Sequence, residues 1–159
     1  MGKLQSALVI EAEDALSPDA QQCLSAYFAE LASRFPGGFD PEIGAASDLE
    51  DFTPPSGCML LVRMEGKPIG CGALRTIEPG VGEIKRMWVS PQARGLGVGR
   101  RLLEALEQSA RARMLTRVRL DTNGVLSEAL RLYRTAGYRE IDRFNDNPYA
   151  QHWFEKIIA

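Results

Sequence analysis

Apolar and polar residues along the chain follow two periods. Alternation at every second residue predicts short strands, and helical spacing predicts amphipathic helices. A helical period predicts three helices: one that Ser17 and Pro18 open and Phe35 ends, one directly after Gly99, and one at 127–136 that a glycine closes. Short apolar runs typical of strands lie at 7–10, 58–64, 69–77, 83–89, 118–121, 138–141 and 152–158.

Three of the expected strands, 58–64, 69–77 and 83–89, follow one another with only short turns that contain glycine between them. This spacing predicts an antiparallel meander. The whole order is strand, helix, meander, helix, strand, helix and two strands. We therefore expect an α+β fold, with a mixed sheet and helices on its faces. The length of 159 residues predicts a single domain over 1–159.

Composition and charge exclude several classes of protein. Hydrophobic residues make up 45% of the chain and charged residues 25%, as in soluble globular proteins rather than disordered or coiled-coil ones. The net charge of −2 lacks the basic excess of a dedicated nucleic-acid binder, and no stretch approaches the ~20 apolar residues of a membrane span. Cys23, Cys58, Cys71 and the single His152 give neither a disulfide framework nor a zinc site. We expect reduced thiols, a cytoplasmic location, and no metal, membrane or nucleic-acid partner.

The clearest chemical signal is the glycine turn, the segment Arg94-Gly95-Leu96-Gly97-Val98-Gly99. Its alternating glycines permit a tight turn and let a ligand approach the backbone. The turn also exposes N–H groups at the start of the next helix, which favours an anion such as phosphate. Because Arg94, Arg100 and Arg101 flank it, we expect a local basic cluster around a phosphate site.

Residues alone leave other interpretations of the glycine turn open. It is not a Walker loop, because Arg100 follows Gly99 where a lysine is needed. A dinucleotide fingerprint fits Gly95 and Gly97 but not Arg100, and Asp121 ends the next strand where a ribose-binding acid would lie. A nicotinamide-dependent oxidoreductase is therefore one alternative, although too little chain follows for a doubly wound sheet. A glycine-rich helix entry without any ligand is another.

The glycine turn resembles the Q/R-x-x-G-x-G/A signature of the GNAT superfamily, the acyl-CoA-dependent N-acyltransferases. Residues 83–91 resemble the family's fourth strand and the turn after it, and 129–138 resemble its fourth helix with the LYxxxGF or LYxxxGY motif. The likeness covers 7–158. It implies a single GNAT-like domain over 1–159, with an αβα-layered fold, a mostly antiparallel sheet of six to seven strands, and about four helices.

The resemblance implies a binding site for acetyl-CoA, the co-substrate of the family. Backbone N–H groups of the glycine turn hold the pyrophosphate, and the pantetheine arm lies along the end of the fourth strand. Many members also have an asparagine seven residues before the motif tyrosine, where this chain has Leu126. Asn123 is the nearest substitute, and Asp121 and Thr122 are others. The implied coenzyme-binding residues are Met87, Trp88, Val89, Arg94, Gly95, Leu96, Gly97, Val98, Gly99, Arg100 and Asn123.

The resemblance also implies two catalytic residues. Glu83 matches the carboxylate that many members use as a base to deprotonate the amine, and Tyr133 matches the tyrosine that protonates the leaving thiolate. Each has a structural alternative: Glu83 as a solvated carboxylate at a strand end, and Tyr133 as a core aromatic. Cys71 as a covalent nucleophile and His152 as a catalytic base are weaker candidates than their structural roles.

We therefore expect an N-acetyltransferase that transfers the acetyl group of acetyl-CoA to a primary amine of a small molecule, by direct attack in a ternary complex. The alternatives are a protein N-terminal or lysine acetyltransferase and a non-catalytic acyl-CoA-binding module. The resemblance places the acceptor between two loops, 36–55 and 143–152, whose acids and aromatics suit a cationic amine. Solvated loop charge is the alternative interpretation. A homodimer is also compatible with the resemblance, because dimers are common among similar proteins.

Overall fold

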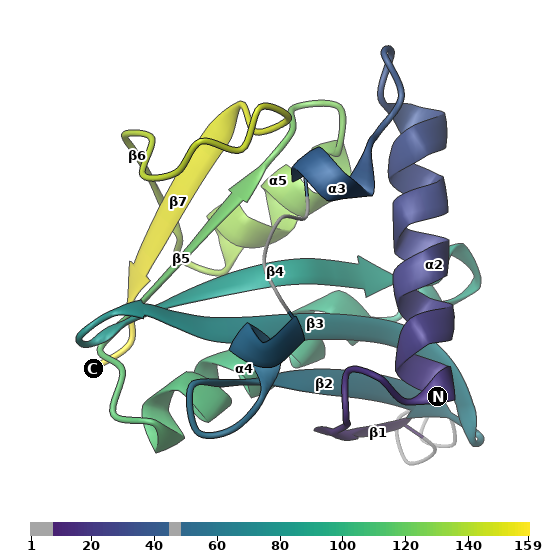
Figure 1. Cartoon of the computed structure of the whole chain (residues 1–159), viewed down its shortest axis with the longest axis horizontal. Coiled ribbons are helices and arrows are strands. Elements are labelled where there is room, and N and C mark those ends of the chain that lie inside the picture. The colour runs from purple at the N-terminus through teal and green to yellow at the C-terminus, as the bar shows by residue number, and fades with distance from the viewer. Residues whose placement is uncertain (1–7, 45–48) are drawn as a thin grey trace.

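The computed structural model describes residues 8–44 and 49–159 and contains a seven-stranded sheet (Figure 1). Its strand order is β1-β2-β3-β4-β5-β7-β6. The elements are β1 (Leu8–Ala12), α2 (Pro18–Arg34), α3 (Pro41–Gly44), η1 (Leu49–Phe52), β2 (Gly57–Met64), β3 (Lys67–Glu78), β4 (Val81–Val89), η2 (Pro91–Ala93), α4 (Val98–Ala112), β5 (Arg117–Thr122), α5 (Ser127–Thr135), β6 (Arg139–Ile141) and β7 (His152–Ile157). The predicted α+β fold is confirmed.

The sheet is antiparallel everywhere except between β4 and β5. Strands β2, β3 and β4 form the predicted meander. After β4 the chain crosses over through α4 and returns in β5, which runs parallel to β4. Within the described residues, this is the one place where neighbouring strands run in the same direction, and two adjoining cavities lie beside it.

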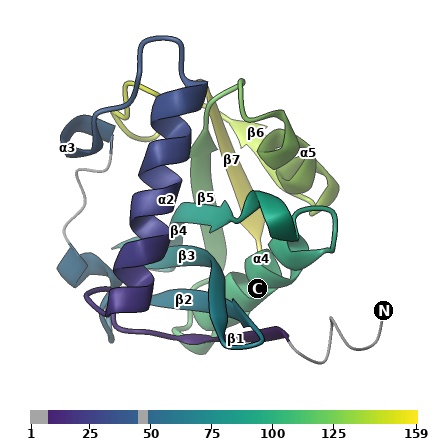
Figure 2. The ribbon, with the colours of Figure 1, turned by 90° about the vertical axis from the view of Figure 1, so that its right-hand side faces the viewer.

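Helices cover both faces of the sheet, because β2 is apolar on both sides. Cys58, Leu60 and Val62 belong to the core that includes α4, whereas Met59 and Leu61 pack with α2. Figure 2 shows α2 on one side of the sheet and α4 and α5 on the other. Across the described residues, no helix combines the length and the apolar character that a membrane crossing requires.

The ends of the helices are set by the residues that the sequence indicated. The hydroxyl of Ser17 accepts a hydrogen bond from the N–H of Ala20 at 3.1 Å and caps α2 directly before Pro18. Gly137 adopts φ 94° after the end of α5, a conformation that favours glycine. Gly95 and Gly97 do the same in the glycine turn, with φ 82° and 78°.

Strands β4 and β5 separate after a short paired stretch. Their pairing covers only Val81–Glu83 against Arg117–Arg119. Farther along β4, the pairs with β3 shift register so that Arg86 and Met87 lie opposite one residue, Gly72. Arg86 has φ 55° at this bulge. The sequence analysis did not predict the bulge, which lies on the stretch of β4 that diverges from β5.

Some predicted boundaries were wrong. The loop 36–57 contains a short helix, α3, as well as the 3₁₀ turn η1, of which only the turn was expected. Asp48 and Ala7 lie outside the described residues. Tyr138 was expected in a strand, but its N–H donates to the carbonyl of Tyr133, and its ring is buried in the core, so β6 begins one residue later.

Candidate active site

Two adjoining cavities lie where β4 and β5 diverge. The larger one, of about 310 Å³, is bounded by α2, the glycine turn and the first turns of α5. The smaller one, of about 90 Å³, is bounded by α2, the ends of β4 and β5, and the loop before β7. The residues that line both are Tyr27, Leu31, Met87, Leu126, Ala129 and Tyr133. The two cavities therefore form one passage, with Tyr133 at the junction.

The structure brings most of the expected coenzyme-binding residues together around the larger cavity. Those in its lining are Met87, Trp88, Val89, Arg94, Gly95, Gly97, Val98, Gly99 and Arg100. Leu96 is not among them and has an exposed side chain. As at the start of any helix, the first N–H groups of α4 have no hydrogen-bond partner within the helix. The end of the larger cavity at the glycine turn therefore suits an anion.

Two of the three arginines around the glycine turn, Arg94 and Arg100, are paired with acids. The guanidinium of Arg94 donates to both carboxylate oxygens of Glu30, at 2.6 and 2.7 Å, and to the carbonyl of Val89 at 3.0 Å. Arg100 forms an ion pair with Glu104 at 3.5 Å. The expected basic cluster is thus largely neutralised by neighbouring carboxylates, which leaves the backbone N–H groups as the main attraction for an anion.

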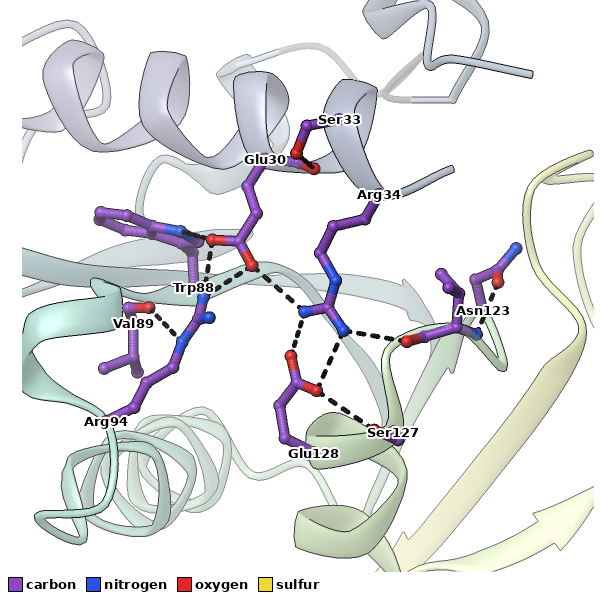
Figure 3. Close-up of polar contacts among 10 residues, drawn as sticks. Glu30, Ser33, Arg34, Trp88, Val89, Arg94, Asn123, Ser127 and Glu128 are labelled. Atoms are coloured by element: carbon purple, nitrogen blue, oxygen red, sulfur yellow. Dashed lines mark hydrogen bonds and ion pairs between the residues drawn. The ribbon is translucent and has the colours of Figure 1, made fainter. Parts of the chain in front are cut away.

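Glu30 connects α2 to the edge of the larger cavity (Figure 3). Besides Arg94, it accepts a hydrogen bond from the indole N–H of Trp88 at 3.0 Å and one from Arg34 at 3.3 Å. Burial by itself would raise the pKa of Glu30, but the hydrogen bonds from Arg94 and Trp88 and the charge of Arg94 lower it below its usual value. Glu30 therefore stays ionised and holds these side chains in place.

Arg34 continues this network to α5. It pairs with the carboxylate of Glu128 and donates to the carbonyl of Val125 at 2.9 Å (Figure 3). The hydrogen bond from Arg34 lowers the pKa of Glu128 to about 2. Glu30, Arg34 and Glu128 all line the larger cavity. Ion pairs from α2 thus reach both of its sides, the glycine turn and the first turn of α5.

The two loops expected to receive the acceptor meet in an aromatic cluster. The rings of Phe39 and Tyr149 lie 4.8 Å apart, and Phe35 lies 5.6 Å from Tyr149. The N–H of Asp40 donates to the Tyr149 hydroxyl at 2.9 Å. All three rings line the smaller cavity.

The acidic residues of these loops are placed differently from the expectation. Those that were expected to attract the amine and are described are Asp40, Glu42, Glu50, Asp51, Asp142 and Asp146, and none of them lines the smaller cavity. Asp51 instead pairs with Arg75 at 3.2 Å, because η1 packs beside β3. The carboxylate that does line the cavity is Asp121, at the end of β5.

Tyr133 lies where the two cavities meet. Its ring is buried, and its hydroxyl is 3.9 Å from the sulfur of Met87. Burial, and secondly the negative charge of Asp121, raise the pKa of Tyr133 above its usual value. The side chain therefore keeps its proton throughout the neutral range. Its place is compatible with the expected acid role, and it also belongs to the hydrophobic core.

Glu83 lines neither cavity, although its partner Lys85 lines the smaller one. Its side chain is only 1% exposed, so the interpretation as a solvated carboxylate was wrong. Arg75 donates to one oxygen at 2.8 Å, and Asn145 and Lys85 contact the other at 3.1 and 3.5 Å. Because these partners surround it and it lines neither cavity, the geometry does not support its expected role as the base.

The side chain of Asn123 forms hydrogen bonds with nearby loops and does not line the larger cavity. Its amide donates to the carbonyl of Tyr149 at 2.8 Å and accepts from the N–H of Val125 at 2.9 Å. It lines the smaller cavity, whereas Leu126, at the position where many members have asparagine, lines both. A contact between Asn123 and the pantetheine arm therefore remains a prediction without support from the geometry.

The weaker candidates lie outside the passage. Cys71 is fully buried in the core below α2, and contact with the Cys23 thiol and burial raise its pKa. Such a thiol is poorly suited to nucleophilic attack. The imidazole of His152 is 2.7 Å from a carboxylate oxygen of Glu140. Within 8–44 and 49–159, no group of three or more His, Cys, Asp or Glu residues is placed to hold a metal ion.

Sequence reasoning missed the residues that support the smaller cavity. Asn145 and Asn147 donate to the Asp121 carboxylate at 2.6 and 3.1 Å. The sequence suggested Asp121 only as a ribose-binding acid or a substitute for the missing asparagine. The available signal was the alternation in β5, where Val118 and Leu120 are buried and Asp121 faces the opposite side.

Comparisons with known proteins identify the family and the fold. The family model described as the acetyltransferase (GNAT) family matches residues 24–138. A protein of Azospirillum brasilense named IAA acetyltransferase is 39% identical over 122 residues, which are 76% of this chain and 78% of that protein. A crystal structure from Klebsiella pneumoniae, assigned as an acyl-CoA N-acyltransferase, has a TM-score of 0.78 at 29% identity, covering 96% of this chain and 98% of that one.

N-acetylglutamate synthase from Neisseria gonorrhoeae, which was solved with coenzyme A and N-acetyl-glutamate, shares the fold. Its TM-score is 0.68 at 20% identity, and the match covers 95% of this chain but 35% of that one. At this identity the likeness concerns the fold alone.

Proposed function

The chain belongs to the acetyltransferase (GNAT) family and is an N-acetyltransferase, and from this premise we propose that it acetylates a primary amine of a small molecule. The observation that carries the proposal is the continuous passage formed by the two cavities. The larger cavity has the glycine turn at one end, and Tyr133 lies at the other, where the larger cavity adjoins the smaller one. An acyl donor and an amine can therefore meet in a ternary complex.

The chain's own residues position the donor in this proposal. N–H groups of Gly97, Val98 and Gly99 bind the pyrophosphate of acetyl-CoA. Where β4 and β5 separate, the main chain of β4 at Met87–Val89 has no partner in β5. This stretch of β4 pairs instead with the amides of the pantetheine arm. This places the thioester carbonyl beside Tyr133 and the entrance to the smaller cavity.

The chemistry is then attack of the amine nitrogen on the thioester carbonyl. A backbone N–H at the end of β4 stabilises the negative charge on the carbonyl oxygen. The C–N bond forms, the C–S bond breaks, and the hydroxyl of Tyr133 donates its proton toward the departing sulfur. Because the pKa of Tyr133 is raised, the proton is present on the phenol when the sulfur leaves.

The size of the smaller cavity favours an acceptor with a slender reacting end. Its volume is about 90 Å³. In this proposal it receives a primary amine on an unbranched carbon, and the rest of the acceptor lies outside it. The aromatic cluster of Phe35, Phe39 and Tyr149 contacts the next part of the molecule. Such rings favour an apolar or cationic group.

The test is incubation of the purified protein with radiolabelled acetyl-CoA and two panels, one of small primary amines and one of peptides with free N-termini or lysines. We expect labelled product and release of free thiol with small amines. Labelling of peptides only would replace the proposal with protein acetylation. The matched control is Gly97→Ala, which strains a residue at φ 78° and is expected to abolish transfer to every acceptor.

A further inference from the structure

Asp121 is the carboxylate of the smaller cavity among the residues that the structure describes. Resting on the proposed function, we propose that Asp121 contacts the ammonium group of the acceptor and takes its proton before attack, in the role that the sequence assigned to Glu83. The other charged or titratable groups in the lining are Lys85, Arg86, Tyr27, Tyr133 and Tyr149.

The position of Asp121 follows from the sheet. Alternation along β5 directs Val118 and Leu120 into the core with α4, so Arg119 and Asp121 face the side that α2 covers. The last residue of β5 paired with β4 is Arg119. Asp121 therefore lies just beyond the point where β4 turns away, stays paired with Trp153 of β7 on its other side, and lines the cavity with its side chain.

The carboxylate of Asp121 is held by neutral donors. The side-chain amide of Asn145 donates to one oxygen at 2.6 Å, and that of Asn147 donates to the other at 3.1 Å. Asn145 is itself fixed by the indole N–H of Trp153, which donates to its oxygen at 2.9 Å. Amide donors orient a carboxylate but bring no positive charge, so neither of them acts as its counterion.

Glu83 shows the contrast. Its oxygens contact two cations, Arg75 at 2.8 Å and Lys85 at 3.5 Å, and it is nearly fully buried. This arrangement neutralises both the acid and Lys85, which would otherwise repel an ammonium from the cavity. Arg86, which also lines the cavity, has its guanidinium 4.8 Å from the ring centre of Phe52. Within 8–44 and 49–159, Asp121 is thus the acidic side chain of this lining that can pair with an incoming ammonium.

Asp121 and Tyr133 are close enough to influence each other. The charge of Asp121 is the second cause of the raised pKa of Tyr133, after burial. Both side chains line the smaller cavity, and Tyr133 also lines the larger one. Asp121 is thus placed to act as a base on the acceptor amine, and Tyr133 is placed to act as an acid on the leaving sulfur.

The step balances as follows. The acceptor arrives as R–NH₃⁺, since a primary alkyl amine has a pKa near ~10.4. One proton passes to Asp121, directly or through one water, stays there during the attack, and is released to solvent after the products form. The neutral nitrogen forms the C–N bond while the C–S bond breaks. The attacking nitrogen loses a second proton, and the sulfur receives one from Tyr133, which regains it from that nitrogen through the cavity. The products are the amide and free CoA thiol, with one proton released.

The experiment compares Asp121→Asn and Asp121→Glu with wild type and with Glu83→Gln. The acceptor is whichever amine the wild type acetylates, small or peptide. We expect Asp121→Asn to lower kcat/KM for the amine about 100-fold, with the Kd for CoA and the unfolding midpoint close to wild type. Asp121→Glu, which keeps the carboxylate, restores part of the rate. The loss in Glu83→Gln is at least about tenfold smaller than that in Asp121→Asn.

A pH profile separates a base from a purely structural residue. Without a base only the neutral amine reacts, so kcat/KM of Asp121→Asn should rise about tenfold per pH unit from pH 6 to 9, while the wild-type profile is flatter. Parallel profiles, or a rate in Asp121→Asn within threefold of wild type, would overturn the inference. Wild-type labelling of peptides alone would instead overturn the small-molecule proposal and leave the Asp121 comparison intact.

Discussion

Tyr133 and Tyr138 are both buried, but their hydroxyl groups have different partners. The hydroxyl of Tyr138 donates to the buried carboxylate of Glu107 at 2.8 Å, beside the ammonium of Lys156 at 3.1 Å. The hydroxyl of Tyr133 lies 3.9 Å from the Met87 sulfur, a weak contact, and borders both cavities. Removing each hydroxyl should therefore separate a role in stability from a role in turnover.

We predict that Tyr133→Phe lowers kcat about 100-fold, because the leaving sulfur loses its acid, while the Kd for CoA changes little. Tyr138→Phe is the matched control. It leaves the buried Glu107 without one donor, so it should cost about 1–3 kcal/mol of unfolding free energy with kcat near wild type. Steady-state kinetics and thermal denaturation measure both effects. Wild-type turnover in Tyr133→Phe would remove this residue from the mechanism.

The roles of individual residues were the hardest part to predict from sequence. Glu83 matches a position that the family often uses for a base, but its partners Arg75 and Asn145 come from β3 and the loop before β7. Nothing in the local sequence reveals that those segments surround it. Asp121 was easier to place, because the period of β5 sets its direction, but its amide partners again lie far along the chain.

At the scale of elements, helix α2 is tied to the walls of the larger cavity by ion pairs. Glu30 joins it to the glycine turn through Arg94, and Arg34 joins it to α5 through Glu128. These contacts link three segments that are distant in sequence and have little other packing in common. Since α2 also packs on the sheet through Ala20, Cys23 and Leu24, these ion pairs add a pH-dependent contribution to contacts that are mainly apolar.

The Arg34–Glu128 pair predicts a loss of stability in acid. Hydrogen bonding from Arg34 lowers the pKa of Glu128 from about 4.5 to about 2, so the stabilisation is complete above pH 4.5 and disappears as the pH falls toward 2. Because the Glu128 side chain is 49% exposed, the contribution stays below about 1 kcal/mol. Denaturation midpoints of wild type and Glu128→Gln should differ at pH 7 and converge near pH 2. A constant difference would contradict this assignment.

Most elements were predictable because each has a strong local signal. The apolar period and the caps of α2 and α5 gave their ends nearly to the residue, and the short glycine turns gave the meander. The bulge at Arg86 and Met87 was not predictable, because it depends on how β4 pairs with β3. That bulge belongs to the stretch of β4 that diverges from β5, so the shape of the site was less accessible to sequence reasoning than the fold.

At the scale of the molecule, the sheet consists of two groups of strands that are joined by few backbone pairs. Strands β1 to β4 form one antiparallel group, and β5, β7 and β6 form another. Between them the strands pair only at Val81–Glu83 with Arg117–Arg119. The larger cavity lies where this pairing has ended, so a ligand bound there adds contacts between the two groups of strands.

We predict that CoA stabilises the whole fold. At a concentration of 100 times its Kd, a ligand that binds only the folded state adds about 2.7 kcal/mol, which raises the Tm of a chain this long by roughly 5–11 °C. Thermal denaturation with increasing CoA measures the shift. Gly97→Ala should abolish it, whereas Gly66→Ala, in a turn far from the cavity and with a similar φ of 81°, should retain it. Equal shifts in both variants would place the binding site elsewhere.

The two tryptophans lie at opposite ends of the site, so their fluorescence can report on binding at each end. Trp88 and Trp153 are the two tryptophans of the chain: the first borders the larger cavity, and the second donates to the amide that orients Asp121. A Trp153→Phe variant would therefore emit only from the coenzyme side, and a Trp88→Phe variant only from the acceptor side. Fluorescence from these two variants could record the order in which donor and acceptor arrive, without a label or a coupled assay.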